Sequence, residues 1–219
     1  MEGSEPGGLP DVDDAALRRW HAGLESLLSR HVEVAQEFLK GPGSGLRAID
    51  MFLLAAVQRS HDIAAAVLML CDARNLAAAA PLVRLQIDTL VRVSYMARSG
   101  DSDGVAHAVI AGVEFRKMKD ADGEFLSDTR LLALARPHHG WVEPVYRRTS
   151  GWVHLSPDHL TAAFGAWGDS EGVFLTRVPF DPEIVPLRIW AELLGATAQA
   201  TREILAYAQA WGAQKEDAP

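Results

Sequence analysis

The sequence predicts an all-α protein, an antiparallel bundle of about five helices with a small extended or hairpin insertion. Apolar residues recur at three- and four-residue steps through several long segments, which is the spacing of one face of a helix. Short turns separate these segments, for example GPGSG at residues 41–45. Long helices joined by short turns pack as an antiparallel bundle.

Three long helices are expected in the first half of the chain. The first begins at Asp13 or Asp14, either of which can cap a helix, and it ends at the glycine-rich turn. The second covers about residues 46–72, and the third covers about residues 76–98. Because the third is apolar on most of its surface, we expect it to be the central helix of the bundle.

The second half of the chain is less regular. A fourth helix is expected over about residues 103–119, and a short one is expected within residues 127–137, where Pro137 ends it. Residues 164–179 alternate apolar side chains between glycines, which is typical of a hairpin or an extended loop. A last long helix covers about residues 181–211.

The domain organisation follows from composition. A length of 219 residues suits one well-buried core, which we place at residues 13–211. The ends, residues 1–12 and 212–219, are polar and are expected to be disordered tails. The N-terminal residues do not resemble a signal peptide, and no apolar run approaches the ~20 residues that span a bilayer. We therefore expect a cytoplasmic protein without a membrane partner.

The charge and the cysteine content argue against several classes of site and function. The single Cys71 excludes an internal disulfide and a zinc site built from several thiolates. The histidines lack the spacing of helical zinc enzymes, and no Glu-x-x-His pair is present, so neither a metal nor another cofactor is expected. Nonspecific nucleic-acid binders are normally basic, whereas this chain has a net charge of −8. Any contact with RNA must therefore use a local patch.

The segment VYRRTSGWVH, residues 145–154, gathers several side chains that could carry chemistry. On a helix, Tyr146, Ser150 and His154 share one face because they are four residues apart. Histidine can move a proton near neutral pH, and a guanidinium can hold phosphate charge with two parallel hydrogen bonds. A histidine and an arginine could together cleave RNA without a metal.

Two arginines are candidates for the phosphate clamp. Arg147 returns to nearly the same helical face as His154, while Arg148 points away unless the helix bends at Gly151. In the cleavage scheme, His154 removes the proton of the 2′-hydroxyl and the arginine stabilises the pentacoordinate phosphorus. In the alternative, both arginines are solvated, and Ser150 and His154 bond each other or the backbone.

A second polar group lies on the predicted central helix. Arg84, Asp88 and Arg92 repeat at four-residue intervals in RLQIDTLVR. Such a series can form surface salt bridges that contribute only a few tenths of a kcal/mol. A central helix has little exposed surface, however, so a buried Asp88 could instead orient the two guanidiniums toward a pocket or toward His154.

These two polar segments carry a resemblance. PLVRLQIDTLVRVSYMA resembles the Arg-x-x-x-Glu helix of a widespread uncharacterised bacterial helical family, in which a Tyr-x-x-x-Ser-x-x-x-His helix follows downstream. Arg84 and Asp88 match the first element, with Asp in place of the usual Glu. The second element is matched by Tyr146, Ser150 and His154.

The arginine and histidine spacing also resembles the Arg-x4–6-His motif of HEPN domains, which Arg147 and Arg148 both satisfy with His154. HEPN domains are dimeric helical bundles, and many are metal-independent ribonucleases of toxin and antiviral systems. The resemblance implies an endoribonuclease with His154 as general base, one of the two arginines as phosphate clamp, and Asp88 orienting Arg84. It also implies a homodimer, RNA as substrate and a cognate antitoxin as partner.

A noncatalytic bundle, acting in interaction or in small-ligand binding, is the alternative function. In that case the expected cluster of Arg84, Asp88, Tyr146, Ser150 and His154 fixes helix register or holds a small anion. The two hypotheses differ in one observable feature. The nuclease needs His154 and an arginine exposed in one cleft, whereas the structural protein would have them buried and bonded to each other.

Overall fold

The computed structural model describes residues 12–40, 45–154, 156–157, 159 and 185–216, and the regular structure of these residues is helical. One isolated bridge, between Lys119 and Phe125, is the only extended pairing among them. The expected all-α bundle is thereby confirmed. The predicted hairpin at 164–179 lies outside the described residues.

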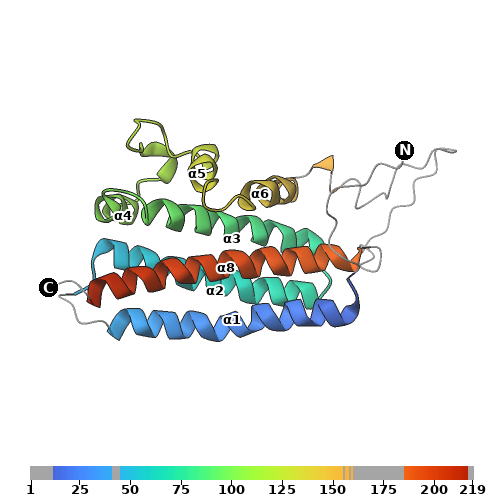
Figure 1. The fold of residues 1–219 in the computed structure, drawn as a ribbon. Helices are drawn as coiled ribbons and strands as arrows, with labels where there is room; N and C mark the ends of the chain where they lie inside the picture. Colours follow the sequence, from blue (N-terminus) through green and yellow to red (C-terminus); the bar gives the residue numbers. More distant parts are fainter. Residues whose placement is uncertain (1–11, 41–44, 155, 158, 160–184, 217–219) are drawn as a thin grey trace.

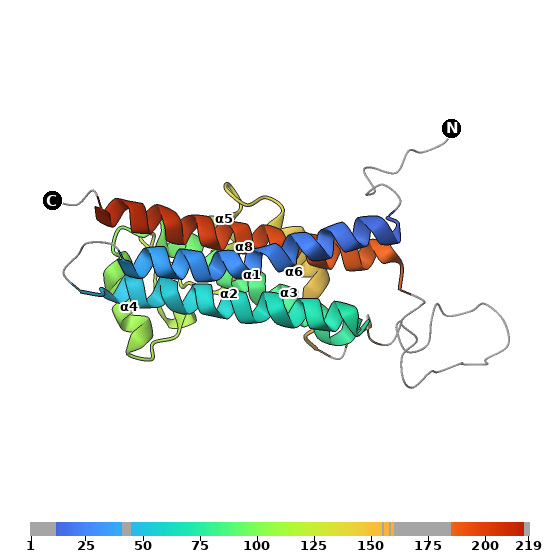
Figure 2. The same ribbon diagram turned by 90° about the horizontal axis from the view of Figure 1, so that it is seen from below.

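Four long helices form the bundle (Figure 1). They are α1 (Asp14–Lys40), α2 (Ala48–Asp72), α3 (Leu76–Met96) and α8 (Leu187–Glu216). The first three alternate in direction, as expected of an antiparallel bundle, and α8 runs in the same sense as α1 and α3 (Figure 1). Figure 2 shows α1 lying against α8 and α2, on the side of the bundle away from α5 and α6.

Three short α-helices and one 3-10 helix lie between α3 and α8 in the sequence, among the elements whose bounds the structure describes. They are α4 (Ser102–Ile110), η1 (Phe115–Lys117), α5 (Asp128–Ala135) and α6 (Val142–Ser150). Helices α5 and α6 pack on α3, while α4 packs on α2. Since α3 also contacts α2 and α8, it is the central helix, as its apolar sequence predicts.

Local capping explains where the first helices begin. The side chain of Asp13 accepts a hydrogen bond from the Ala16 amide at 2.6 Å and so caps α1. Asn75 caps α3 in the same way, through the Ala78 amide at 3.2 Å. These contacts satisfy amides that have no partner within the helix, and the predicted starts therefore lie close to the observed ones.

The expected fourth helix, residues 103–119, is shorter than predicted and ends at Ile110. Gly112 adopts a φ of +88°, a conformation that a continuing helix does not allow. The amide of Val113 then bonds the carbonyl of Ala108 at 2.9 Å and closes the helix end.

The last helix also differs from its prediction at both ends. It begins at Leu187, while residues 181–184 lie outside the described part of the chain. It continues to Glu216, so most of the predicted C-terminal tail, 212–219, is helical. The indole of Trp211 donates to Asp50 Oδ1 at 2.7 Å, which fastens this end of α8 to α2.

A buried polar network ties the four long helices together. His31 of α1 bonds Ser60 Oγ of α2 at 3.0 Å through its Nε2 atom. The amide of Gln86 on α3 donates to Ser60 at 2.6 Å and to Thr201 of α8 at 2.9 Å. Buried polar groups need such partners, and the network therefore fixes the helix register.

By length and composition α2 could cross a membrane, but many of its side chains pack in the bundle core, as in the core helix of a soluble protein. The core holds Ile49, Leu53, Ala64 and Val67 from this helix, all nearly inaccessible to solvent.

Candidate functional site

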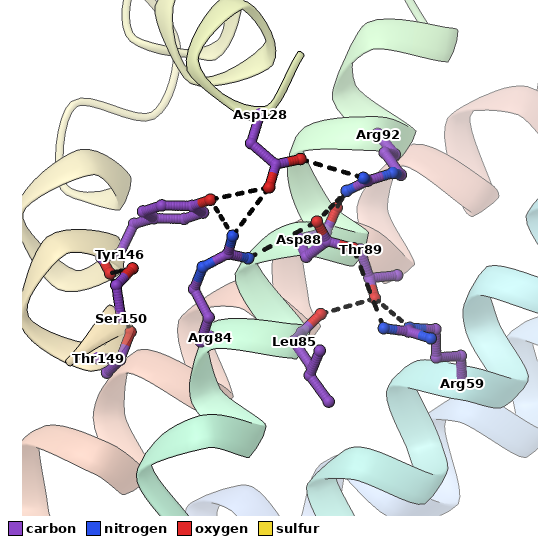
Figure 3. Close-up of polar contacts among 10 residues, drawn as sticks. All are labelled: Arg59, Arg84, Leu85, Asp88, Thr89, Arg92, Asp128, Tyr146, Thr149 and Ser150. Atoms are coloured by element: carbon purple, nitrogen blue, oxygen red, sulfur yellow. Dashed lines mark hydrogen bonds and ion pairs between the residues drawn. The ribbon is translucent and has the colours of Figure 1, made fainter. Parts of the chain in front are cut away.

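The structure brings three of the expected site residues together on the outer side of α3 (Figure 3). Arg84 Nη1 lies 3.7 Å from Asp88 Oδ1, one helical turn away. The Arg84 guanidinium also lies over the ring of Tyr146, 3.4 Å from its centroid, and donates a hydrogen bond to the Tyr146 hydroxyl. The long-range pairing of α3 with α6 that the two motifs predict is therefore present.

Asp128, the first residue of α5, is a central member that the sequence did not indicate. Its Oδ2 atom accepts from Arg84 Nη2 and from the Tyr146 hydroxyl, both at 3.1 Å. Its Oδ1 atom lies 3.3 Å from Arg92 Nη2, and Arg92 also donates to Asp88. One carboxylate at the start of α5 thus links two turns of α3 to α6.

Arg59 of α2 extends this group toward the next helix. Its Nε atom donates to Thr89 Oγ1 at 3.0 Å, and its Nη2 atom lies 4.0 Å from Asp88 Oδ2. We call the following residues the α3 cluster: Arg59, Arg84, Asp88, Arg92, Asp128 and Tyr146. Three arginines face two aspartates, so the cluster carries a formal charge of +1.

Burial sets the electrostatics of the cluster. The side chain of Arg84 is 14% exposed, and this burial lowers the pKa of its guanidinium, while Asp88 and Asp128 act in the opposite direction. An arginine keeps its charge at neutral pH even so. Removing either carboxylate would leave a buried cation with fewer partners, which is unfavourable.

Ser150 and His154 do not join the α3 cluster. The helix α6 ends at Ser150, and Ser150 Oγ donates to the Tyr146 carbonyl at 2.6 Å. Gly151 follows. The amides of Trp152 and Val153 then bond the carbonyls three residues earlier, which forms tight turns in place of the α-helix. The expected single helical face through His154 is wrong, because hydroxyl side chains bond the last carbonyls and the helix stops before reaching that residue.

His154 lies exposed in the turn beyond α6. Within the described part of the chain its ring makes no hydrogen bond or ion pair. It is therefore neither buried nor bonded to Ser150, which differs from the arrangement expected of a purely structural histidine.

The two candidate arginines are also exposed. Arg147 Nη2 lies 2.7 Å from Glu143 Oε1, and its side chain is 76% exposed. Arg148 Nη1 lies 2.9 Å from Glu192 Oε2 of α8, with a side chain 65% exposed. Among the described residues neither arginine contacts His154, so the geometry does not choose between them.

Glu143 links Arg147 to the helix before it. The hydrogen bond from Arg136 is the main cause that lowers the pKa of this carboxyl, with Arg147 adding to the effect. Glu143 is therefore ionised at neutral pH, and it competes with any phosphate for Arg147.

A second polar group, which sequence reasoning missed, lies between α3 and α8. Ser94 Oγ lies 3.1 Å from His139 Nε2, and His139 Nδ1 lies 2.6 Å from Glu203 Oε2. The Tyr207 hydroxyl also lies 3.0 Å from His139 Nε2. These residues could not be grouped from the sequence, because no local pattern relates residues so far apart.

The order serine, histidine, carboxylate is that of a nucleophilic triad. Ser94, however, has no exposed surface, and His139 is 6% exposed. Arg98 further bonds both Ser94 and Tyr207. A substrate cannot reach Ser94. We therefore interpret these polar contacts as structural, because they hold His139, in the segment before α6, against α3 and α8.

Comparison with known proteins adds no relative: no family model, curated protein or solved structure matches the chain.

Proposed function

We propose that the protein is a metal-independent endoribonuclease, HEPN-like or a diverged relative, that works in a toxin or defence setting. The observation that carries this proposal is the exposure of His154, Arg147 and Arg148 at one end of α6. All three side chains are accessible to a polynucleotide, and His154 has no competing partner among the described residues.

In the proposed reaction, His154 takes the proton of an RNA 2′-hydroxyl, and the 2′-oxygen attacks the adjacent phosphorus. The bond from phosphorus to the 5′-oxygen breaks, which leaves a 2′,3′-cyclic phosphate and a 5′-hydroxyl. The leaving 5′-oxygen takes a proton from a second His154, supplied by another copy of the chain. Arg147 or Arg148 stabilises the extra negative charge on the pentacoordinate phosphorus.

The ion pairs of the two arginines are compatible with this role. Both arginines are exposed, although their glutamate partners are partly buried, and ion pairs at the surface contribute only about 0–1 kcal/mol to stability. A phosphate can therefore replace Glu143 or Glu192 at small cost. This matters in a chain of net charge −8, because affinity for RNA must come from a few local cations.

The α3 cluster supports the proposal as a positioning device. Asp88 orients Arg84, and Arg84 holds the ring and hydroxyl of Tyr146, which lies on the same helix as Arg147 and Arg148. Because α6 has only 9 residues, it would be marginal without such packing. The cluster thus fixes the helix that presents the two candidate phosphate clamps, Arg147 and Arg148.

Several partners follow from the proposal. RNA is the substrate, and a homodimer brings two copies of His154 to one cleft. A cognate antitoxin would silence the enzyme by covering the exposed end of α6. Such an enzyme would act in the cytoplasm, where its RNA substrates are.

RNA cleavage by the purified protein in EDTA tests the proposal. We expect the double variant Arg147→Ala/Arg148→Ala to lose cleavage by about 100-fold or more, since each arginine can stabilise the transition-state charge. The matched control is Arg116→Ala/Lys117→Ala, which removes two exposed cations of η1. Equal losses in both double variants would show only a general electrostatic effect and would contradict the assigned role.

A noncatalytic anion-binding bundle is the second candidate, favoured by the formal charge of +1 on the α3 cluster. Arg59 is half-exposed and keeps guanidinium donors for a ligand. In this case a small anion such as phosphate binds wild type and His154→Ala equally, whereas Arg59→Gln weakens binding.

A further inference from the structure

A cavity of about 280 Å³ lies at the end of the bundle where α1 and α8 begin and α2 ends (Figure 1, right). None of its lining residues belongs to the α3 cluster or to α6. The polar side chains on its wall are Arg18, His21, Asp72 and Arg74, and the indole of Trp190 lies beside them.

The cavity is cationic in an acidic protein. The wall contains two arginines, Arg18 and Arg74, and one carboxylate, Asp72, and these three side chains carry a formal charge of +1. His21 Nε2 lies 3.1 Å from Asp72 Oδ1, which leaves both guanidiniums without a recorded ion pair among the described residues. The chain as a whole carries −8, so this local excess favours an anion.

The ring of Trp190 forms part of the apolar wall of the cavity. Trp190 is 1% exposed, and its Nε1 atom is buried and has no hydrogen-bond partner among the described residues. The buried N–H does not reach the cavity, so polar recognition of a ligand must come from the two guanidiniums.

Arg74 has a left-handed backbone conformation, which glycine usually adopts. Arg74 has a φ of +52° just after the end of α2, where glycine is the common residue because a Cβ is unfavourable there. Its guanidinium lies over the Trp190 ring, 5.6 Å from the centroid. The residue with the unfavourable backbone is therefore also a cation of the cavity wall. Strained backbone conformations are concentrated at functional sites.

We propose that this cavity binds a small organic carboxylate. The guanidiniums of Arg18 and Arg74 hold the carboxylate with charge-assisted hydrogen bonds, and the Trp190 ring contributes apolar surface. The apolar body of the ligand lies against Leu17 and Leu194. The volume limits the ligand to a compact molecule, at the lower end of the usual range for binding sites.

The thiol of Cys71, which also lines the cavity, does not oppose an anion. Burial, with Asp72 adding to the effect, raises the pKa of Cys71 to about 12, so the thiol is neutral at physiological pH. The site therefore contains no second negative charge beside Asp72. It is independent of the ribonuclease proposal, because it shares no residue with α6.

Calorimetric titration of the full chain with benzoate tests the proposal. We expect one site per chain, and we expect Arg74→Gly to weaken binding by about tenfold or more because a charge-assisted contact is lost. The same variant should unfold at a higher temperature than wild type, since glycine removes the strained backbone. Arg18→Gln removes the second guanidinium and should also weaken binding.

The control variant Arg116→Ala removes an exposed arginine far from the cavity and should bind benzoate as wild type does. Absence of benzoate binding to wild type at concentrations up to about 10 mM would overturn the proposal. Binding that Arg74→Gly and Arg18→Gln leave unchanged would overturn it as well. If inorganic phosphate binds in preference to benzoate with the same sensitivity, the carboxylate class is wrong.

Discussion

The guanidinium of Arg84 lies over the ring of Tyr146, 3.4 Å from its centroid, and joins a helix of the bundle core to the short helix that carries Arg147 and Arg148. Asp128 accepts a hydrogen bond from both residues of this pair. A cation–π contact that is partly shielded from water contributes about 1–2 kcal/mol. The position of α6 therefore depends on a few side chains that can be changed one at a time.

The Tyr146 hydroxyl is the first of these groups to test. Tyr146→Phe keeps the ring over Arg84 but removes the bonds with Arg84 and Asp128. We expect the free energy of unfolding to fall by about 1.5–3 kcal/mol, the contribution of hydrogen bonds to charged groups. Urea denaturation followed by circular dichroism measures this change.

Tyr95→Phe is the matched control, because the Tyr95 ring packs against Phe115 and its hydroxyl has no recorded hydrogen bond to the described residues. It should change the free energy of unfolding by less than ~0.5 kcal/mol. An equal effect of the two substitutions would show that the contacts of the Tyr146 hydroxyl do not stabilise the fold.

Asp88→Asn tests the carboxylate between two arginines. The substitution leaves Arg84 and Arg92 without one of their negative partners, and both are largely buried. We expect a loss of about 2–3 kcal/mol in the free energy of unfolding, measured by urea denaturation. Asp62→Asn, at an exposed position on α2, should have almost no effect. A neutral result for Asp88→Asn would mean that the cluster does not hold α6.

The stability of the bundle should depend on pH through His31. Burial lowers the pKa of His31 below its usual value of 6.5, although the bond to the Leu27 carbonyl acts in the opposite direction. The unfolded chain then binds a proton more readily than the folded chain. The contribution of neutral His31 to stability is therefore complete above pH 6.5 and is lost as the pH falls from 6.5 toward its folded pKa.

Free energies of unfolding measured at pH 7 and pH 5 check this prediction. The carboxyls with lowered pKa, among them Glu143 and Glu203, lose their contribution only below about pH 4.5, so they do not interfere in this window. The decrease between the two pH values should be smaller in His31→Gln than in wild type. His107→Gln, at an exposed histidine, should retain the full decrease.

The long helices could be predicted from the sequence because their signals are local. The cap at Asp13, the glycine-rich sequence at residues 41–45 and the apolar spacing of α3 are each signals that lie within a few residues. The fourth helix was predicted too long, because Gly112 ends it in a conformation that apolar spacing does not reveal. The end of α8 was predicted too early, because the hydrogen bond from Trp211 to Asp50 that holds this end is a long-range contact.

The candidate site could be predicted only in part. Arg84, Asp88 and Tyr146 were expected together, since charges on a core helix and the polar face of a second helix need partners. Asp128 and Arg59 were missed because they come from other helices, and no sequence spacing relates them to α3. His154 was expected on the same helical face as Tyr146 because of its four-residue spacing from Ser150. That spacing has no meaning beyond Ser150, where α6 ends.

The most direct test of the proposed ribonuclease is the chemistry of the RNA ends that the purified protein produces in EDTA. The ribonuclease account predicts 2′,3′-cyclic phosphate and 5′-hydroxyl ends, detected by mass spectrometry. Cleavage should fall by about 100-fold or more in His154→Ala, as expected for a general base, and should persist in His107→Ala. Ends of another kind, equal cleavage by both histidine variants, or no cleavage by wild type would contradict it.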